Sequence, residues 1–395
     1  MAFGSARKLD AKKQYLLSKK RIAVLIDWYL PGNKAGGPVK SIYSLLNVLN
    51  EQYDFFVITR NNDLGSFAPY KNVECNKWTK FKDTTIYYFS NENLNKNNLA
   101  AVINEISPDF VYLNSFWSYF FSIVPLQLKK QNKINAKVIL APRGMLSRGA
   151  ISIKPVKKQL YLFLSKFSKV YNDLLFHATT DNEEKEIQNY FPKAKIKIAS
   201  NVNSTLVSKN KKSEKQSGEL KLFYLSRVAR VKNLLFALNI LKEIKTEGSI
   251  VYDIYGSLED ATYWEECEKV IQSLPPNIKV NYKYEIDYED VPIVIANYHF
   301  LFLPTLNENF GHTIVESLVS GCPVIITDQT PWDINKNNCG FAISLNKKEE
   351  FKSAILGAIQ INDTEYKKMS ENCVTFIEQK INIKENIQAY SELFL

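Results

Sequence analysis

Short apolar runs alternate with longer amphipathic segments along most of the chain. The runs are typical of strands buried on both faces, and the segments between them repeat apolar positions three and four residues apart, as helices do. This alternation predicts parallel sheets that are covered by helices on both sides. The runs that we predict to be strands are 21–27, 55–59, 85–89, 110–113, 137–142, 174–178, 195–199, 221–226, 251–256, 278–284, 300–303 and 324–327.

The length of the chain predicts two domains. The chain has 395 residues, of which 45% are apolar and 13% aromatic, and can therefore bury a large core. Residues 208–219 are polar and lack periodicity, which indicates an interdomain linker or a long surface loop. Residues 1–20 are basic but lack the apolar core of a secretory signal, so we predict a basic N-terminal arm there.

Composition argues against several classes of protein. No apolar run approaches the roughly 20 residues that a membrane-spanning helix needs. The five cysteines are odd in number and include no C-x-x-C pair, which argues against disulfides and zinc and favours a reducing cytoplasm. With three histidines and no metal-ligand cluster, we expect neither a protein-bound catalytic metal nor a cofactor. The net charge of +10 predicts anionic partners.

The span 110–172 contains no acidic residue, although it carries eleven lysines and arginines interleaved with aromatic residues. Such a surface suits anionic lipid headgroups or a lipid-diphosphate acceptor, and it would also suit RNA. No RNA-recognition signature accompanies the span, so we favour peripheral contact with the inner face of the cell membrane and no nucleic acid. The alternative is a basic face that is merely solvated.

The most informative stretch is 304–323, where the pattern predicts a loop and a helix between two strands. Ligands of parallel sheets bind at the carboxyl ends of strands, and a helix that begins near His312 would offer free N–H groups to a phosphate. Glu308 on the loop and Glu316 on the helix could bracket a nucleotide-sugar, although a solvated pair of glutamates is the alternative. The polar positions that we expect on the ligand side of the helix are Thr313, Glu316, Ser317 and Ser320.

This stretch resembles the E-x7-E signature of retaining glycosyltransferases of family 4, which have the GT-B fold. The wider pattern also matches, with Pro-x-x-Asn-Glu-x-Phe-Gly before the second glutamate and Gly-x-Pro-Val-Ile after it. The resemblance implies that Glu308 lies by the donor sugar and that Glu316 holds the ribose hydroxyls. It assigns contacts with sugar and phosphate to the backbone of Phe310, Gly311, His312 and Thr313. Asn309 departs from the glycine that is common in the family.

Two cations follow the first strand of the predicted second domain. Arg227 and Lys232 are five positions apart across a tight loop, so both can reach one diphosphate group. They resemble the Arg-x4-Lys pair of the family, which implies a catalytic role for both beside Glu308. We expect Arg230 between them to face solvent. Gly256 ends the next predicted strand and is expected to lie near the nucleotide.

The first predicted domain offers a glycine pair and two loops. Gly36 and Gly37 precede Pro38 at a predicted helix start, and the resemblance implies that they face the donor phosphates. A P-loop is rejected because Pro38 and Val39 occupy the places of its lysine and its serine or threonine. A plain glycine-rich turn remains the alternative. Asn114 and Arg143 follow two predicted strands and are the candidates for acceptor binding, with a surface arginine as the alternative for Arg143.

The resemblance implies an α/β protein of the GT-B class, with two Rossmann-like, doubly wound parallel-sheet domains facing a central cleft. Residues 21–205 would form the N-terminal acceptor domain and 206–375 the C-terminal donor domain. A C-terminal helix in 376–395 would cross back to the first domain. We expect no metal to be required.

The predicted function is retaining transfer of a sugar from a UDP- or GDP-sugar to a hydroxyl of a glycan acceptor. We expect a lipid-linked acceptor in the synthesis of a bacterial surface polysaccharide such as O-antigen, capsule or exopolysaccharide. A nucleotide-sugar epimerase or hydrolase of the same fold is one alternative, and a non-catalytic protein that binds an anionic ligand is the other. The sequence discloses neither the sugar and base of the donor nor the linkage formed.

Overall fold

The computed structural model describes residues 19–32, 34–152, 155–168, 170–202, 213–288 and 290–395. Nearly all of the predicted basic arm and residues 208–212 of the predicted linker lie outside these ranges. The chain divides into two compact units. The first unit contains residues 1–32, 45–200 and 387–395, and the second contains 33–44 and 201–386.

The first unit is built on an eight-stranded sheet with the order β3-β4-β2-β1-β5-β6-β7-β8. Every neighbouring pair is parallel except β3 and β4. The strands are β1 (Lys20–Leu25), β2 (Tyr53–Arg60), β3 (Trp78–Phe81), β4 (Thr84–Phe89), β5 (Phe110–Leu113), β6 (Lys137–Leu140), β7 (Leu175–Ala178) and β8 (Lys195–Ile198). Because β1 lies between β2 and β5, the strand order reverses there.

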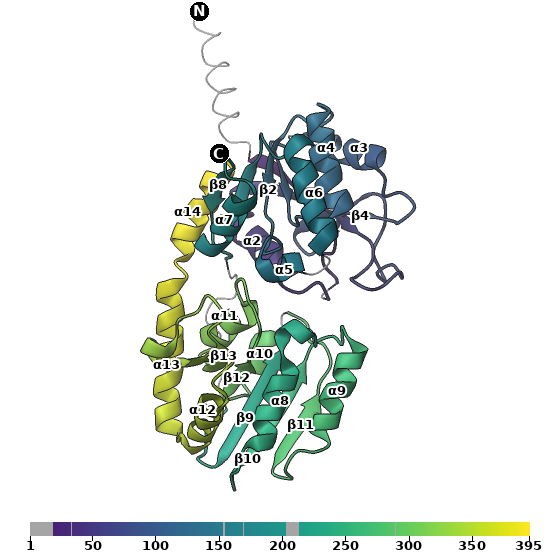
Figure 1. The fold of residues 1–395 in the computed structure, drawn as a ribbon. Helices are drawn as coiled ribbons and strands as arrows, with labels where there is room; N and C mark the ends of the chain where they lie inside the picture. Colours follow the sequence, from purple (N-terminus) through teal and green to yellow (C-terminus); the bar gives the residue numbers. More distant parts are fainter. Residues whose placement is uncertain (1–18, 33, 153–154, 169, 203–212, 289) are drawn as a thin grey trace, which may run out of the picture. The chain divides into compact units, whose positions relative to one another are not determined.

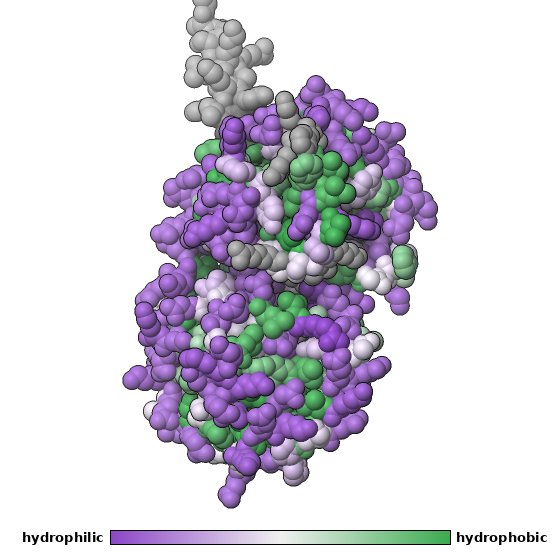
Figure 2. Space-filling model, viewed as in Figure 1, coloured by the Kyte–Doolittle hydropathy of each residue, from purple (hydrophilic) through white to green (hydrophobic). Residues whose placement is uncertain are grey.

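Helices of the first unit cover this sheet (Figure 1). They are α3 (Lys96–Ile106), α4 (Val124–Lys130), α5 (Arg148–Ser152), α6 (Pro155–Ser168) and α7 (Asp181–Tyr190), with a π-helical turn at Tyr119–Ile123. The helix α2 (Gly37–Leu49) begins in the second unit and ends in the first. Most of the visible surface is hydrophilic, but hydrophobic residues reach it where α6 lies (Figure 2).

The second unit contains a six-stranded parallel sheet with the order β11-β10-β9-β12-β13-β14. Its strands are β9 (Glu219–Leu225), β10 (Ser249–Tyr255), β11 (Ile278–Tyr282), β12 (Phe300–Leu303), β13 (Val324–Thr327) and β14 (Gly340–Ile343). Its helices are α8 (Leu234–Glu243), α9 (Ala261–Ile271), α10 (Val291–Ile295), α11 (His312–Val319), α12 (Lys348–Gln360) and α13 (Asp363–Lys380), with 3-10 turns at Arg230–Lys232 and Asn335–Asn337.

The predicted strands are confirmed, and the two sheets with their helices confirm the α/β prediction. Two edge strands were not predicted, β3 in the first sheet and β14 in the second. The strand β3 pairs antiparallel with β4, and its four residues are only partly buried or exposed, so it lacks the continuous apolar run that marked the predicted strands. The strand β14 begins with a glycine, and its two central residues are only partly buried.

The C-terminal segment is helical but interrupted, since α13 ends at Lys380 and α14 (Ile383–Leu393) follows. The last nine residues belong to the first unit. There the ring of Phe394 is fully buried and makes edge contacts with the rings of Tyr53, Phe55, Phe110 and Tyr112. These aromatic contacts anchor the end of the chain to β2 and β5 of the first unit.

Candidate active site

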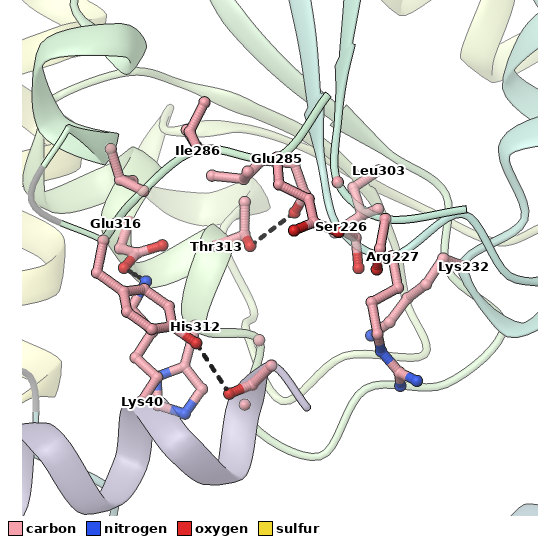
Figure 3. A pocket seen from close by; sticks show the side chains of 18 of the residues that line it. Lys40, Ser226, Arg227, Lys232, Glu285, Ile286, Leu303, His312, Thr313 and Glu316 are labelled. Atoms are coloured by element: carbon pink, nitrogen blue, oxygen red, sulfur yellow. Dashed lines mark hydrogen bonds and ion pairs between the residues drawn. The ribbon is translucent and has the colours of Figure 1, made fainter. Parts of the chain in front are cut away.

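The candidate site lies in the second unit, at the carboxyl ends of its central strands. β9 pairs with β10 on one side and with β12 on the other, so the strand order of the sheet changes direction at β9. In open parallel sheets such a switch point leaves a crevice in which ligands bind. A pocket occupies this place (Figure 3). It is lined by Lys34, Gly36, Gly37, Lys40, Leu225, Ser226, Arg227, Lys232, Gly256, Ser257, Glu285, Ile286, Tyr288, Val291, Leu303, Glu308, Gly311, His312, Thr313 and Glu316.

Glu308 and Lys232 form an ion pair within the pocket. Only 14% of the lysine side chain and 17% of the glutamate side chain are exposed, so water screens the pair weakly. The loop that carries Glu308 is fixed to the 3-10 turn of Lys232, since the N–H of Leu306 and the hydroxyl of Thr305 both donate to the carbonyl of Val231, at 2.8 and 3.1 Å. The carboxylate and the ammonium that the sequence assigned to catalysis therefore meet.

Arg227 follows β9 directly and enters the pocket beside Lys232 (Figure 3). Its guanidinium is paired with Glu259 at 2.5 Å, and its carbonyl accepts a hydrogen bond from the buried Tyr224 hydroxyl at 2.9 Å. The side chain is one-third exposed, so Arg227 can exchange its partner for a bound anion. Arg230 is 55% exposed and pairs with Asp260 and Glu266, which confirms the prediction that it faces away from the site.

The amino end of α11 forms one wall of the pocket. The helix is preceded by Gly311 in the left-handed conformation, with φ of 77°, and its first residue is His312. The hydroxyl of Thr313 donates to the carbonyl of Leu225 at 2.8 Å, which ties this end of the helix to β9. The first amides of a helix have no carbonyl partner within it and carry partial positive charge, so the pocket wall favours an anion.

Glu316 lies one turn further along α11 and is 4% exposed. One carboxylate oxygen is paired with the ammonium of Lys40, and the other, Oε2, is buried and has no hydrogen-bond partner among the described residues. Burial lowers the pKa of Lys40 to about 7, and the Tyr288 ring lies 5.1 Å from the lysine nitrogen. A buried acceptor without a partner is uncommon in folded proteins, which marks Glu316 as a place for a donor from a ligand.

The prediction that Ser317 and Ser320 face the ligand is wrong. Both are buried, and the hydroxyl of Ser317 donates to the carbonyl of Cys322 at 2.8 Å. All residues from Ile314 to Val319 are buried, so α11 has no solvent-facing polar side. The helix is enclosed because it packs between the sheet and other parts of the second unit, including α13.

Gly36 and Gly256 lie where a side chain would be strained or would collide, whereas Gly37 leaves room for ordinary contact. Gly36 has φ of +64°, and a Cβ on Gly37 would lie 3.6 Å from the ring of His312. A Cβ on Gly256 would lie 2.0 Å from the carbonyl oxygen of Ser226. The His312 ring nitrogen Nε2 is 2.8 Å from the hydroxyl of Ser41. The start of α2 therefore contacts α11 within the second unit.

Sequence reasoning missed Lys40, Ser41 and Tyr288. Lys40 lies in the first turn of the helix after the glycine pair, and its position on a predicted helix start was the only available signal. Nothing in the local pattern indicates that its ammonium meets Glu316, because the two residues belong to distant parts of the chain.

The acceptor candidates Arg143 and Asn114 lie in the first unit but line neither this pocket nor the one described next. The guanidinium of Arg143 donates to the Tyr112 hydroxyl at 2.9 Å and to Asn114 Oδ1 at 2.8 Å. His177 accepts from Tyr112 in turn, and its Nε2 lies 2.7 Å from the carbonyl of Ala199. Arg143 is thus part of a polar network with Tyr112, Asn114 and His177.

A second pocket occurs at the carboxyl end of the sheet of the first unit. It has a volume of about 1010 Å³ and is mostly apolar in character. Asp27 follows β1, and its carboxylate lies 3.6 Å from Nε of Arg60. Burial raises the pKa of Asp27, and a hydrogen bond with Ser118 and the charge of Arg60 oppose this shift. Aromatic residues of the lining are Trp28, Phe67, Trp117 and Tyr119.

The described residues contain no group of three or more His, Cys, Asp or Glu side chains placed to hold a metal ion. Among the same residues, no helix has both the length and the apolar character that crossing a bilayer requires.

Comparison with known proteins identifies the fold. Residues 207–374 match the family model described as Glycosyl transferases group 1. An uncharacterized 41.2 kDa protein in the cps region of Klebsiella pneumoniae is 20% identical over 85% of this chain and 94% of its own length. The UDP-N-acetylglucosamine–peptide N-acetylglucosaminyltransferase GtfA subunit of Streptococcus agalactiae is 25% identical over 76% of this chain, which spans 58% of that protein.

A crystal structure of Anabaena HepE in complex with UDP-glucose aligns with 94% of this chain and 99% of its own, with a TM-score of 0.68 and 16% identity. The chain therefore has the GT-B fold, and its residues 207–374 are similar to the group 1 glycosyltransferases. The matched segment contains Arg227, Lys232, Glu308 and Glu316.

Proposed function

We propose that the protein transfers a sugar, with retention of configuration, from a UDP- or GDP-sugar to a hydroxyl of a glycan acceptor. The observation that carries the proposal is the convergence of Arg227, Lys232, Glu308 and the amino end of α11 on one pocket at the reversal of the strand order. The similarity to a protein of a cps region and to a structure that holds UDP-glucose supports a role in surface-polysaccharide synthesis with a nucleotide-sugar donor.

The pocket suits the departure of a nucleoside diphosphate. Cleavage of the sugar–phosphate bond leaves negative charge on the diphosphate and oxocarbenium character on the sugar. Lys232, Arg227 and the amides at the start of α11 would stabilise the phosphate charge, and preorganised groups of this kind supply a large part of enzymatic rate enhancement. A phosphate that pairs with Lys232 would release Glu308, whose carboxylate would then face the sugar. Direct front-face attack by the acceptor is the expected route to retention.

Glu316 supports the assignment of the ribose position. Its buried Oε2 has no partner among the described residues, and ribose hydroxyls would supply the missing donors. Lys40 would remain as the counter-charge of the carboxylate. This gives the second glutamate of the E-x7-E pattern a role in binding the nucleotide rather than in the chemical step.

The second pocket is the proposed site of the acceptor sugar. Its aromatic side chains offer flat faces to a sugar ring, and the Asp27 and Arg60 pair offers both an acceptor and donors to hydroxyl groups. This assignment replaces Arg143 and Asn114 as the acceptor-binding residues, because their polar groups already bond to one another and to Tyr112. We propose a metal-independent reaction and a cytoplasmic enzyme.

The test compares two cations of the same 3-10 turn. Lys232→Ala removes the cation inside the pocket, and we expect nucleotide release in the presence of acceptor to fall on the order of 10²- to 10³-fold. Arg230→Ala is the matched control, because Arg230 pairs with Asp260 and Glu266 outside the pocket, and its rate should be nearly unchanged. Full activity of Lys232→Ala would refute the assignment of the site.

The same assay separates the alternatives. An epimerase or hydrolase would turn over the nucleotide-sugar at the same rate with and without acceptor. A non-catalytic binder would show no turnover, and its affinity for an anionic ligand such as RNA would fall steeply with salt. Acceptor-dependent release of UDP or GDP from a panel of nucleotide-sugars would support transfer and identify the donor.

A further inference from the structure

The helix α6 of the first unit exposes apolar side chains where a surface helix normally carries polar ones. Val156, Leu160, Phe163 and Leu164 are 77%, 57%, 58% and 55% exposed. Their spacing of four, seven and eight residues from the first places all four on one stripe. The opposite side of the helix contains the buried Leu162 together with the buried Ser165. Figure 2 shows hydrophobic residues at the surface in the region where Figure 1 places α6.

The segment that carries this stripe is strongly basic. From 148 to 169 the sequence contains six lysines and arginines and no acidic residue. Lys157 is exposed and adjoins Val156 in the stripe. Lys158 is half-buried instead, because its ammonium donates to the carbonyl of Ala150 at 2.6 Å and lies 5.5 Å from the centre of the Trp117 ring. These contacts fix α6 to α5 and to the loop after β5, so the apolar stripe is held facing solvent.

We infer that this face of α6 docks on an anionic lipid surface. An apolar stripe within a cationic segment is what an interfacial helix needs, since the side chains enter the boundary of the acyl chains while lysines meet the headgroups. A second copy of this chain is disfavoured as the occupant, because a symmetric contact would bring the same two cationic segments together. Nucleic acid would satisfy the charges but would leave the four apolar side chains without a partner.

The inference does not depend on the proposed catalytic function. It places the membrane beside the second pocket, however, because Lys158 and Ala150 line that pocket as well as fixing the base of α6. A lipid-linked acceptor held in the membrane would therefore meet the first unit close to this pocket.

The experiment measures binding of the full chain to sedimenting vesicles. One set contains phosphatidylcholine alone, and the other contains phosphatidylcholine mixed with phosphatidylglycerol. We expect the wild-type protein to bind the anionic vesicles about tenfold or more tightly than the neutral ones. The double variant Leu160→Gln, Phe163→Gln should lose on the order of tenfold or more in affinity for the anionic vesicles, because two apolar side chains no longer enter the lipid.

The matched control is Ile293→Gln on α10 of the second unit, a residue that is 58% exposed in the same way but has no basic segment around it. It should bind like the wild type. Circular dichroism would check that the double variant is folded, and because both of its residues are exposed we expect the spectrum to be unchanged. Equal binding of the wild type to both vesicles, or undiminished binding by the double variant, would overturn the inference.

A self-association experiment tests whether a second copy of the chain, rather than lipid, binds the exposed face of α6. Sedimentation velocity of the wild type and the double variant should give the same monomer mass at matched concentration. A dimer in the wild type that the double variant abolishes would show that α6 joins two copies of the chain, and the lipid inference would then be wrong.

Discussion

Replacement of Gly256 by alanine tests the packing on which the candidate site is built. Gly256 follows β10 and has φ of +133°, a conformation that side chains rarely adopt. Its N–H donates to the carbonyl of Tyr284 at 2.9 Å, and its carbonyl accepts from the Tyr282 hydroxyl at 2.8 Å. An alanine Cβ would lie 2.0 Å from the oxygen and 2.6 Å from the carbon of the Ser226 carbonyl. These are backbone atoms, so no side-chain rotation can relieve the overlap.

The expected loss of stability has two parts. The unfavourable φ costs about 1–3 kcal/mol. Separation of the ends of β9 and β10 would also break the hydrogen bonds from Ser226 N–H to the Tyr255 carbonyl and from Val228 N–H to the Ser257 carbonyl, which are 3.0 and 2.8 Å long. At about 0.5–1.5 kcal/mol for each bond, the total is roughly 2–6 kcal/mol. Nucleotide release should fall too, because the displaced segment carries Arg227.

The measurement is urea unfolding of Gly256→Ala beside Gly357→Ala. Gly357 lies in α12, and a Cβ there would meet no atom within 4 Å, so alanine should stabilise the helix by about 0.5–1 kcal/mol. The same replacement of glycine by alanine is thus expected to lower the free energy of unfolding at position 256 and to raise it at position 357. A loss smaller than about 1 kcal/mol at Gly256, or equal shifts of the two midpoints, would refute the proposed contact between β9 and β10.

Two further predictions concern the first unit. Burial and the charge of Arg143 lower the pKa of His177 to about 3, so only the unfolded chain gains its proton as the pH falls below about 6.5. The contribution of neutral His177 to the free energy of unfolding is therefore fully present above that pH, and the wild type should be about 2 kcal/mol less stable at pH 5 than at pH 7. Urea unfolding at the two pH values should show a smaller difference for His177→Gln than for the wild type, and equal differences in the two proteins would contradict the assignment. The buried Glu183 carboxylate accepts from Gly144 N–H and from the N–H and hydroxyl of Thr179, at 2.6–2.8 Å. Glu183→Ala should cost about 3–5 kcal/mol in the same measurement because these donors lose their partner, whereas exposed Asp181→Ala should cost less than about 1 kcal/mol, and similar losses would count against the network.

The elements of this protein could be predicted from sequence because each depends on its own residues. The four-residue runs of β5 and β12 are apolar throughout and completely buried, so a continuous apolar run was a sufficient signal. β3 was missed since an exposed edge strand carries no such run. The spacing of Glu308 and Glu316 likewise placed one carboxylate before α11 and the other one turn inside it, because helix geometry is local.

Tertiary structure decided which groups these side chains meet. The sequence period distinguished an apolar and a polar side of α11 but did not indicate what packs against each side. The polar side is buried, and the hydroxyl of Ser317 donates to the carbonyl of Cys322. Arg143 follows a predicted strand end as expected, yet its half-buried guanidinium is bonded to Tyr112 and Asn114. Lys40 meets Glu316 although nothing near either residue indicates the other. A run of residues determines its own backbone and its apolar face, whereas the partner of a charge comes from whichever distant segment the packed core brings alongside it.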